Sequence, residues 1–310
     1  ETFARGIFYL ESMYVDPTKV KQQDLIENAL QGIVGQLDPH TVLMPRKAFE
    51  QLTIDTQGKF GGVGIIVSQD EERGRIVVVS PIEDTPASRA GVKSGDEIVA
   101  IDGVDLSTLK GPQAVDKMRG EPGSTIVLTI FRPSTEETKD FKLTREVIKV
   151  RSVAREPLTN KINYVKVSSF QENTGDDLEK FLKKADKESP EGLIIDLRDN
   201  PGGLLDQAVR MTDLFVESGL IVSTVGRDPD RIEREFARKR GTYTGFPIVV
   251  LVNGGSASAA EIVAGALQDH ERALVLGTTT FGKGSVQTLV SLPDGSGLKL
   301  TVARYYTPKD

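Results

Sequence analysis

The chain has 310 residues, no cysteine, and 45 acidic against 39 basic residues, which gives a net charge of −6. That length exceeds one hydrophobic core, so we expect two domains and an accessory segment. The lack of cysteine excludes thiol catalysis, zinc thiolate sites and disulfides, and the acidic balance gives no electrostatic footprint for nucleic acid or an anionic membrane.

Residues 1–55 are predicted to form a helical arm that serves packing or dimerisation. Apolar residues recur at three- and four-residue spacing from position 2 to 37, which indicates two amphipathic helices interrupted at Asp16 and Pro17. The Leu-Asp-Pro-His run at 37–40 closes the second helix, and a third, short helix is predicted to start at 47–51.

Residues 56–148 are predicted to form a separate β-rich module. A glycine cluster at 58–64 precedes a short strand at 65–68, and a second strand follows at 75–80. A helix, a glycine turn and a strand then occupy 86–103, before a helix at 113–118 and a strand at 125–132. This order of elements resembles a PDZ domain.

The glycine cluster of this module predicts a binding site for a peptide carboxyl terminus. Glycine permits the positive backbone angles with which successive N–H groups converge on a carboxylate. The following strand offers an edge to which an extended peptide can add. The predicted residues are Gly61, Gly62, Val63, Gly64 and Ile65. The alternative is a glycine-rich hairpin that binds nothing.

Residues 149–310 are predicted to form an α/β layer, because strands and helices alternate there. Mostly apolar strands at 192–197 and 248–252 are typical of a buried parallel sheet. The charged stretch 227–240 interrupts this pattern and is predicted to be a solvated excursion. An antiparallel pair at 286–292 and 298–305 ends the chain.

Ser258 lies in a run of small residues, 253–261, that connects a buried strand to an amphipathic helix. Small residues let a substrate backbone approach, and a helix N-terminus offers unpaired N–H groups to an oxyanion. The same serine, with Glu261 three residues later, also fits a helix capping box that requires no catalysis. Taken alone, the run favours the capping box.

Lys283 changes this balance, because glycines flank it and no carboxylate occurs between Glu271 and Asp294. A lysine without a local anion is suited to desolvation. Lowering its pKa from about 10.4 to about 7 requires roughly 4.6 kcal/mol, which lies within the reach of burial. Gln287, four residues on, lies on the same face and can orient the amine without adding negative charge.

A histidine base is the competing interpretation, and the chain contains only His40 and His270. If one helix runs from Ser258 to His270, about 18 Å separates the two residues, which is too far for proton transfer. His40 is not excluded by spacing, but its Leu-Asp-Pro-His context supplies no orienting partner.

The segments 198–203, 253–261 and 281–287, together with the PDZ-like insertion and the 37–40 run, resemble those of carboxyl-terminal processing peptidases, also called tail-specific proteases. The resemblance covers nearly the whole chain. It implies a mixed α/β fold, with a ClpP/crotonase-like protease core, an inserted PDZ-like β-sandwich or barrel domain at 56–148 and the helical arm. It also implies a serine, lysine and glutamine catalytic set without a cofactor.

Carried onto this sequence, the resemblance makes Ser258 the nucleophile rather than Ser256, Lys283 the base and Gln287 its orienting partner. The Pro-Gly-Gly turn at 201–203 would supply one oxyanion N–H, for which we favour Gly203 over Gly202, and Ala259 the other. Arg119 is the candidate for a basic residue of the PDZ domain that gates the active site, the alternative being a solvated arginine at a helix end. Family members usually continue past the Tyr-Thr-Pro motif at 306–308, where this sequence departs from the pattern.

The resulting expectation is a serine endopeptidase that cuts polypeptides near an accessible carboxyl terminus. The resemblance suggests a bacterial periplasm or cell envelope, or a plastid lumen, with a homo-oligomer expected and an adaptor or lipoprotein partner allowed. The chain begins at Glu1 without a signal-peptide pattern, which fits either a cytoplasmic protein or a trimmed chain, and we favour trimming at both ends. Two rivals remain: a PDZ adaptor on an inactive peptidase core, and a crotonase-like enzyme acting on acyl thioesters.

Overall fold

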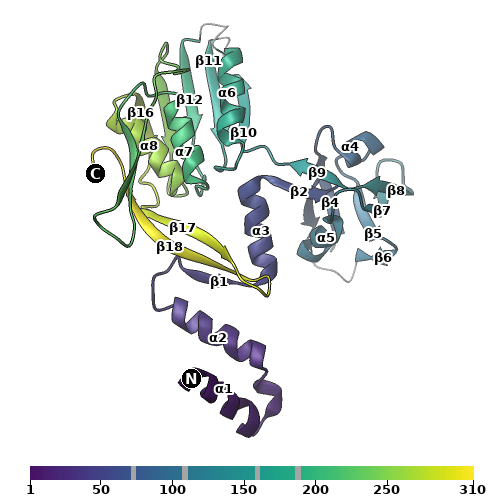
Figure 1. The fold of residues 1–310 in the computed structure, drawn as a ribbon. Helices are drawn as coiled ribbons and strands as arrows, with labels where there is room; N and C mark the ends of the chain where they lie inside the picture. The colour runs from purple at the N-terminus through teal and green to yellow at the C-terminus, as the bar shows by residue number, and fades with distance from the viewer. Residues whose placement is uncertain (71–74, 107–110, 158–160, 186–189) are drawn as a thin grey trace. The chain divides into compact units, whose positions relative to one another are not determined.

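The computed structural model describes residues 1–70, 75–106, 111–157, 161–185 and 190–310. The chain divides into two compact units, residues 1–57 with 151–310 and residues 58–150. The mixed α/β architecture that the sequence predicts is present (Figure 1), whereas the division at 55 and 148 into three domains stays a proposal. Within the described ranges, no helix is long and apolar enough to cross a membrane.

A five-stranded sheet forms the centre of the first unit, in the order β10-β11-β12-β15-β16. All neighbours pair in parallel except β10 with β11, as expected from the alternation of strands and helices. The strands are β10 (Val153–Pro157), β11 (Ile162–Val167), β12 (Gly192–Asp196), β15 (Ile248–Val252) and β16 (Ala273–Gly277).

Three amphipathic helices bury their apolar sides against this sheet and form one core with it. They are α6 (Thr174–Ala185), α7 (Leu205–Asp213) and α8 (Ala259–Asp269). Since β12 and β15 are adjacent and parallel, their carboxyl ends meet at one edge of the sheet. The turns that follow these strands are the ones that the sequence singles out for catalysis.

A second sheet of the same unit is built around β18 (Gly297–Tyr306), which pairs with β1, β13 and β17. The other strands are β1 (Val42–Met44), β13 (Leu220–Val225), β14 (Ile232–Phe236) and β17 (Ser285–Ser291). Every residue of β14 is exposed, and the charged stretch 227–240 faces solvent as predicted. The stretch also contains this strand, which its composition did not indicate. Pairing of β1 with β18 places the 37–40 run beside β18.

The N-terminal arm contains the two predicted helices, α1 (Thr2–Met13) and α2 (Gln22–Val34), separated by a short 3-10 turn at Pro17–Lys19. The break occurs where predicted, because the Asp16 carboxylate accepts the N–H of Thr18 and a proline opens the turn. The third helix, α3 (Arg46–Gln57), is longer than predicted.

The second unit is a six-stranded sheet of order β3-β4-β5-β7-β8, with β6 on β5, and a two-stranded ribbon of β2 with β9. Its elements are β2 (Lys59–Gly62), β3 (Ile65–Asp70), β4 (Arg75–Pro81), α4 (Pro86–Ala90), β5 (Glu97–Ile101), β6 (Val104–Asp105), α5 (Gly111–Met118), β7 (Thr125–Arg132), β8 (Glu137–Thr144) and β9 (Glu146–Lys149). Strand β3 lies at the edge of its sheet, with β4 as its neighbour.

Candidate active site

Ser258 lies in a sharp turn between β15 and the first residue of α8. Its backbone has φ 56° and ψ −116°, a conformation that non-glycine residues rarely adopt and that is typically retained at functional sites. Its N–H donates to Oε2 of Glu261 at 2.8 Å, and its carbonyl accepts from the N–H groups of Glu261 and Ile262. The strained serine is therefore held from both sides, and its side chain remains half-exposed.

Ser256, the other serine of the run, has a structural role. It is fully buried, and its hydroxyl donates to the carbonyl of Leu197 at 2.7 Å and accepts the N–H of Asn253 at 3.0 Å. With its proton engaged on a carbonyl and no access to solvent, this hydroxyl is not positioned to attack a substrate. The geometry therefore favours Ser258 of the two.

Hydrogen bonds join the serine turn to the Pro-Gly-Gly turn after β12. The N–H of Ala257 donates to the carbonyl of Asn200 at 2.9 Å. The side chain of Asn253 accepts from the N–H of Asp199 and donates to its carboxylate, both at 2.9 Å. These contacts form because β12 and β15 end side by side, and they fix the spacing between the two turns.

The two glycines of the Pro-Gly-Gly turn lie where any side chain would collide. A Cβ at Gly202 would be 2.8 Å from Cβ of Ser258, and a Cβ at Gly203 would be 2.2 Å from the carbonyl oxygen of Phe170. Both glycines also have positive φ, 98° and 143°. The N–H of Gly202 is taken by Oδ1 of the buried Asn200 at 2.9 Å.

Glu261 connects the serine turn to the lysine loop. Its Oε1 accepts from the Thr280 hydroxyl at 2.7 Å and from the N–H of Gly282 at 2.6 Å. Its Oε2 accepts from the backbone N–H groups of Ser258 and Lys283, at 2.8 and 2.9 Å. A single carboxylate oxygen thus brings together the backbones of the two residues that the sequence nominates as nucleophile and base.

The position of Glu261 corrects one premise of the sequence argument, that Lys283 has no nearby anion. Glu261 lies 22 residues before Lys283, so it is not among the carboxylates close to the lysine in sequence. Burial still lowers the pKa of Lys283, and the charge of Lys299 lowers it further, while the charge of Glu261 raises it. The lowered pKa agrees in direction with the role of a base, although burial has to prevail over an opposing charge.

Tyr305 is a site residue that the sequence analysis missed. Its hydroxyl lies 3.2 Å from the carbonyl oxygen of Ser258 and also donates to the carbonyl of Lys283. Burial, followed by the charge of Glu261, raises its pKa well above the ordinary value, so this hydroxyl keeps its proton. The signal available in the sequence was only its place beside the Tyr-Thr-Pro motif.

Gln287 extends from β17 toward β18. Its amide nitrogen donates to the Ser285 hydroxyl at 2.8 Å and to the Thr301 hydroxyl at 3.3 Å. The register of β17 against β18 shifts between Val286 and Gln287, so the strand carries a local irregularity directly after the lysine loop.

Of the two histidines considered as bases, His270 has a structural partner for its ring. His270 follows α8 and its Nε2 contacts the carbonyl of Leu220 at 2.7 Å. His40 is held through its backbone N–H, which donates to Asp38 at 2.8 Å, a bond that does not involve the imidazole. In the ranges that the structure describes, no cluster of three or more histidine or acidic residues could hold a metal ion.

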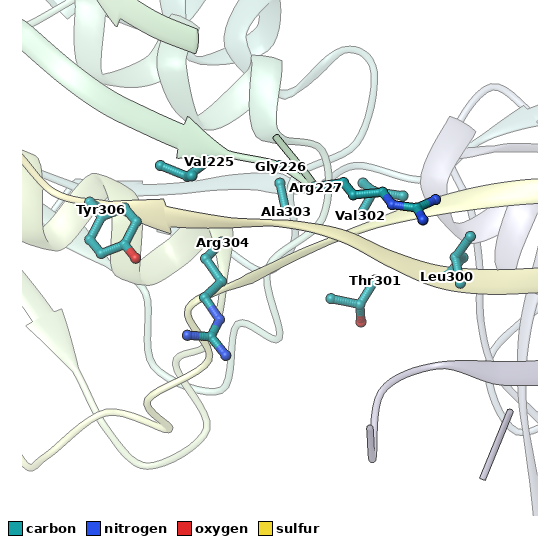
Figure 2. Close-up of a pocket in the computed structure, with 9 residues that line it drawn as sticks. All are labelled: Val225, Gly226, Arg227, Leu300, Thr301, Val302, Ala303, Arg304 and Tyr306. Atoms are coloured by element: carbon teal, nitrogen blue, oxygen red, sulfur yellow. The ribbon is translucent and has the colours of Figure 1, made fainter. Parts of the chain in front are cut away.

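A cavity of about 690 Å³ lies along β18 and the end of β13, and its lining includes neither Ser258 nor Lys283 (Figure 2). Figure 2 shows the side chains of two consecutive β18 residues, Thr301 and Val302, on opposite sides of the strand. It is an open groove beside the site rather than the place where the proposed chemistry occurs.

In the second unit, the glycine cluster is divided between a strand and a turn. Gly61 and Gly62 belong to β2 and pair with Val147 and Glu146 of β9. Val63 and Gly64 form the link to β3, and Gly64 has φ +79°. The strand that begins at Ile65 pairs with β4 on one side.

Arg119 follows α5 and is only partly exposed. Its guanidinium lies 4.9 Å from the centre of the Phe60 ring, which is a cation–π geometry. It is thus packed against its own unit rather than fully solvated.

Comparison with known proteins agrees with the architecture. Residues 161–310 match the model of peptidase family S41, and residues 61–144 match that of the PDZ domain. Over 92% of its length the chain is 48% identical to a carboxy-terminal-processing protease of Bartonella bacilliformis, of which it covers 66%. It is 36% identical to a carboxyl-terminal-processing protease of a Picosynechococcus species, over 99% of this chain and 75% of the relative.

A solved structure supports the same likeness. The photosystem II D1 C-terminal processing protease superposes with a TM-score of 0.55 at 30% identity, over 99% of this chain and 88% of that one. The chain spans about two thirds to three quarters of the length of the two sequence relatives.

Proposed function

Because the chain belongs to peptidase family S41, as a serine-type peptidase of the carboxyl-terminal processing kind with a PDZ domain, we propose that it cleaves polypeptides near their carboxyl ends with Ser258 as nucleophile and Lys283 as base. The observation that carries the proposal is the shared Glu261 oxygen, which accepts from the backbone N–H groups of both residues.

The proposed reaction begins with a neutral amine at position 283. Lys283 takes the proton from the Ser258 hydroxyl while the serine oxygen attacks the scissile carbonyl, and it later gives that proton to the leaving amine. Water then attacks the acyl-enzyme, with the same amine as base, and releases the new carboxyl end. Burial, which lowers the pKa of Lys283, supports this role. Gln287 is proposed to orient the amine.

Two backbone N–H groups are proposed to stabilise the tetrahedral oxyanion, those of Gly203 and Ala259. Ala259 is the first residue of α8, where N–H groups have no partner within the helix. Gly203 is preferred over Gly202, because the N–H of Gly202 already donates to Asn200.

The second unit is proposed to bind the substrate tail. Strand β3 has an edge beyond its pairing with β4, and an extended peptide can add there. Val63, Gly64 and Ile65 lie at the start of that edge, with Gly61 and Gly62 in the preceding strand. Arg119 is proposed to gate activity.

The chain's relatives are processing proteases of bacteria and of chloroplasts. We propose for this chain a periplasmic or cell-envelope location, a homo-oligomeric state, and an adaptor or lipoprotein partner. Polypeptides with accessible carboxyl termini are the proposed substrates, and no cofactor takes part in the proposed chemistry.

The test is degradation of unfolded casein by the wild type, Ser258→Ala and Lys283→Ala, with Ser256→Ala as the matched serine control. The first two variants should lose at least about 10⁴-fold in turnover, as expected when a member of a nucleophile–base pair is removed. Ser256→Ala should remain active. Equal degradation by all four proteins would overturn the proposal. No degradation by the wild type, with tail binding retained, would support the adaptor alternative.

A further inference from the structure

The Leu-Asp-Pro-His run is not used by the proposed chemistry, yet one of its residues is densely hydrogen-bonded. Oδ1 of Asp38 accepts from the N–H groups of His40 and Thr41, at 2.8 and 3.0 Å, and Oδ2 accepts from the Thr41 hydroxyl at 2.6 Å. A further bond to Oδ1 comes from the Thr301 hydroxyl at 3.1 Å, across 263 positions of sequence. Asp38 is thus tied to the strand β18.

Thr301 links Asp38 to Gln287. Its backbone N–H donates to the Thr41 hydroxyl at 3.1 Å, and Thr301 is the pairing partner of Gln287 in the register of β17 with β18. Its hydroxyl accepts from the amide nitrogen of Gln287 at 3.3 Å. One hydroxyl therefore contacts both a carboxylate and a carboxamide.

The chemistry of these groups fixes the direction of the chain of bonds. An ionised carboxylate only accepts, so the single proton of the Thr301 hydroxyl is committed to Asp38. The lone pairs of Thr301 then face Gln287, which must present its NH₂ group rather than its oxygen. The low pKa of Asp38, which the Thr41 hydroxyl lowers most, agrees with an ionised acceptor at the end of the chain.

We propose that Thr301, held by Asp38, is a positioning residue that sets which end of the Gln287 carboxamide is available to the catalytic lysine. With the nitrogen of Gln287 engaged by Thr301 and Ser285, the carboxamide oxygen is the end left to accept from the Lys283 ammonium that forms during the reaction. This inference rests on the proposed function, and it gives the Leu-Asp-Pro-His run a role in catalysis at a distance.

The first test is Thr301→Val, which keeps the shape of the side chain and removes the hydroxyl. We expect kcat for peptide cleavage to fall about five- to tenfold, the usual effect of one lost hydrogen bond, with KM unchanged. Thr301→Ser, which restores the hydroxyl, should recover most of the wild-type kcat. Asp38→Asn retains an oxygen acceptor and should lose less, about twofold.

The decisive comparison places Thr301→Val in a Gln287→Ala background. If Thr301 acts through Gln287, the second substitution should cause no further loss of kcat, because the group it orients is already absent. An equal loss in both backgrounds, or no rescue by serine, would overturn the inference. Melting temperatures of all variants separate a loss of positioning from a loss of folding.

The same experiment keeps this inference apart from the proposed function. Ser258→Ala and Lys283→Ala serve as inactive references. If those references still cleave, the catalytic assignment itself is wrong. If the references are inactive, and the losses of kcat caused by Thr301→Val and Gln287→Ala add up in the double variant, only the positioning role of Thr301 is wrong.

Discussion

Glycine-rich turns in the two units have different structural roles. In the first unit, Gly202 lets its turn approach the serine turn and Gly203 lets it approach the backbone of Phe170, and the polar groups around these glycines are hydrogen-bonded to one another. In the second unit, Gly64 supports a turn into β3, a strand with an edge left for a further strand. The difference teaches that the proposed chemistry needs groups fixed in advance, whereas tail binding needs backbone that the fold leaves unpaired.

The largest effects are expected when one turn glycine in each unit is replaced by alanine, in two separate variants. Gly203→Ala puts a methyl group 2.2 Å from the carbonyl oxygen of Phe170 at a φ of 143°, so the turn must move away from Phe170 and displace the N–H of residue 203. We expect kcat to fall at least about 100-fold, as when one oxyanion donor is lost, while binding of a carboxyl-terminal tail peptide is unchanged.

Gly64→Ala should do the reverse. The added methyl group would lie 2.3 Å from Cβ of Thr85 at a φ of 79°, and the start of β3 should be displaced. Tail-peptide affinity, measured by fluorescence anisotropy, should weaken about tenfold, which corresponds to about 1.4 kcal/mol, with kcat at saturating substrate less affected. If Gly64→Ala instead abolished kcat and left tail binding intact, the separation of roles between the two turns would be wrong.

The next effect tests whether the bonds around the serine are catalytically important. Glu261→Gln removes the charge and turns one acceptor oxygen into a donor, so the bonds from one pair of donors are disrupted, either the two N–H groups on Oε2 or the hydroxyl and the N–H on Oε1. We expect kcat to fall about 10- to 100-fold, since a hydrogen bond to a charged group contributes about 1.5 to 3 kcal/mol.

Glu261→Gln should also shift the pH dependence of activity in a defined direction. Lys283 acts as a base when neutral, so activity rises with pH through its pKa. The charge of Glu261 raises that pKa, and its removal should move the acidic limb of kcat/KM to lower pH. Glu271→Gln, at an exposed position after α8, is the control and should leave the limb in place. A shift to higher pH would contradict this electrostatic role.

A smaller effect concerns the strand that carries the Pro-Gly-Gly turn. Burial disfavours the charge of Asp196, but hydrogen bonds from Arg198 and Tyr164 prevail and lower its pKa to about 2. A depressed carboxyl pKa stabilises the fold above the unfolded value of 3.8, and this stabilisation disappears as the pH falls toward 2. It amounts to about 2 kcal/mol.

Asp196→Asn should therefore lower the free energy of unfolding at pH 7 and flatten its decline between pH 4 and pH 2. Urea titrations of the wild type and the variant across that range measure the difference. Asp230→Asn, in an exposed turn, provides the matched control. Parallel pH profiles for the wild type and Asp196→Asn would show that this carboxyl group is not coupled to folding.

The sequence was sufficient for the elements whose apolar pattern is local. The parallel strands β12 and β15 and the helices of the arm were predicted within a few residues, because their burial follows from periodicity. The exposed strand β14 was not predicted, because none of its residues is buried and its pairing with β13 is set by the backbone.

For the candidate site, the sequence nominates residues but does not predict the contacts that hold them. Glu261 could be recognised as a capping residue, but its bond to the backbone of Lys283 spans 22 positions. The bond from Thr301 to Asp38 spans 263. Contacts of this kind depend on how segments distant in sequence are brought together within one unit, and no spacing rule along the chain encodes that placement.

A small predicted change in turnover separates the two serines of the Ser-Ala-Ser run. Ser256→Ala removes a buried hydroxyl and leaves the N–H of Asn253 and the carbonyl of Leu197 without that partner, which should cost about 1 to 3 kcal/mol of stability. Thermal unfolding measures that loss. Below the melting temperature the variant should keep its turnover within about tenfold of the wild type, because its hydroxyl supports the turn and is not proposed to react. A folded Ser256→Ala protein as inactive as Ser258→Ala would mean that the buried serine, and not the strained one, is the nucleophile.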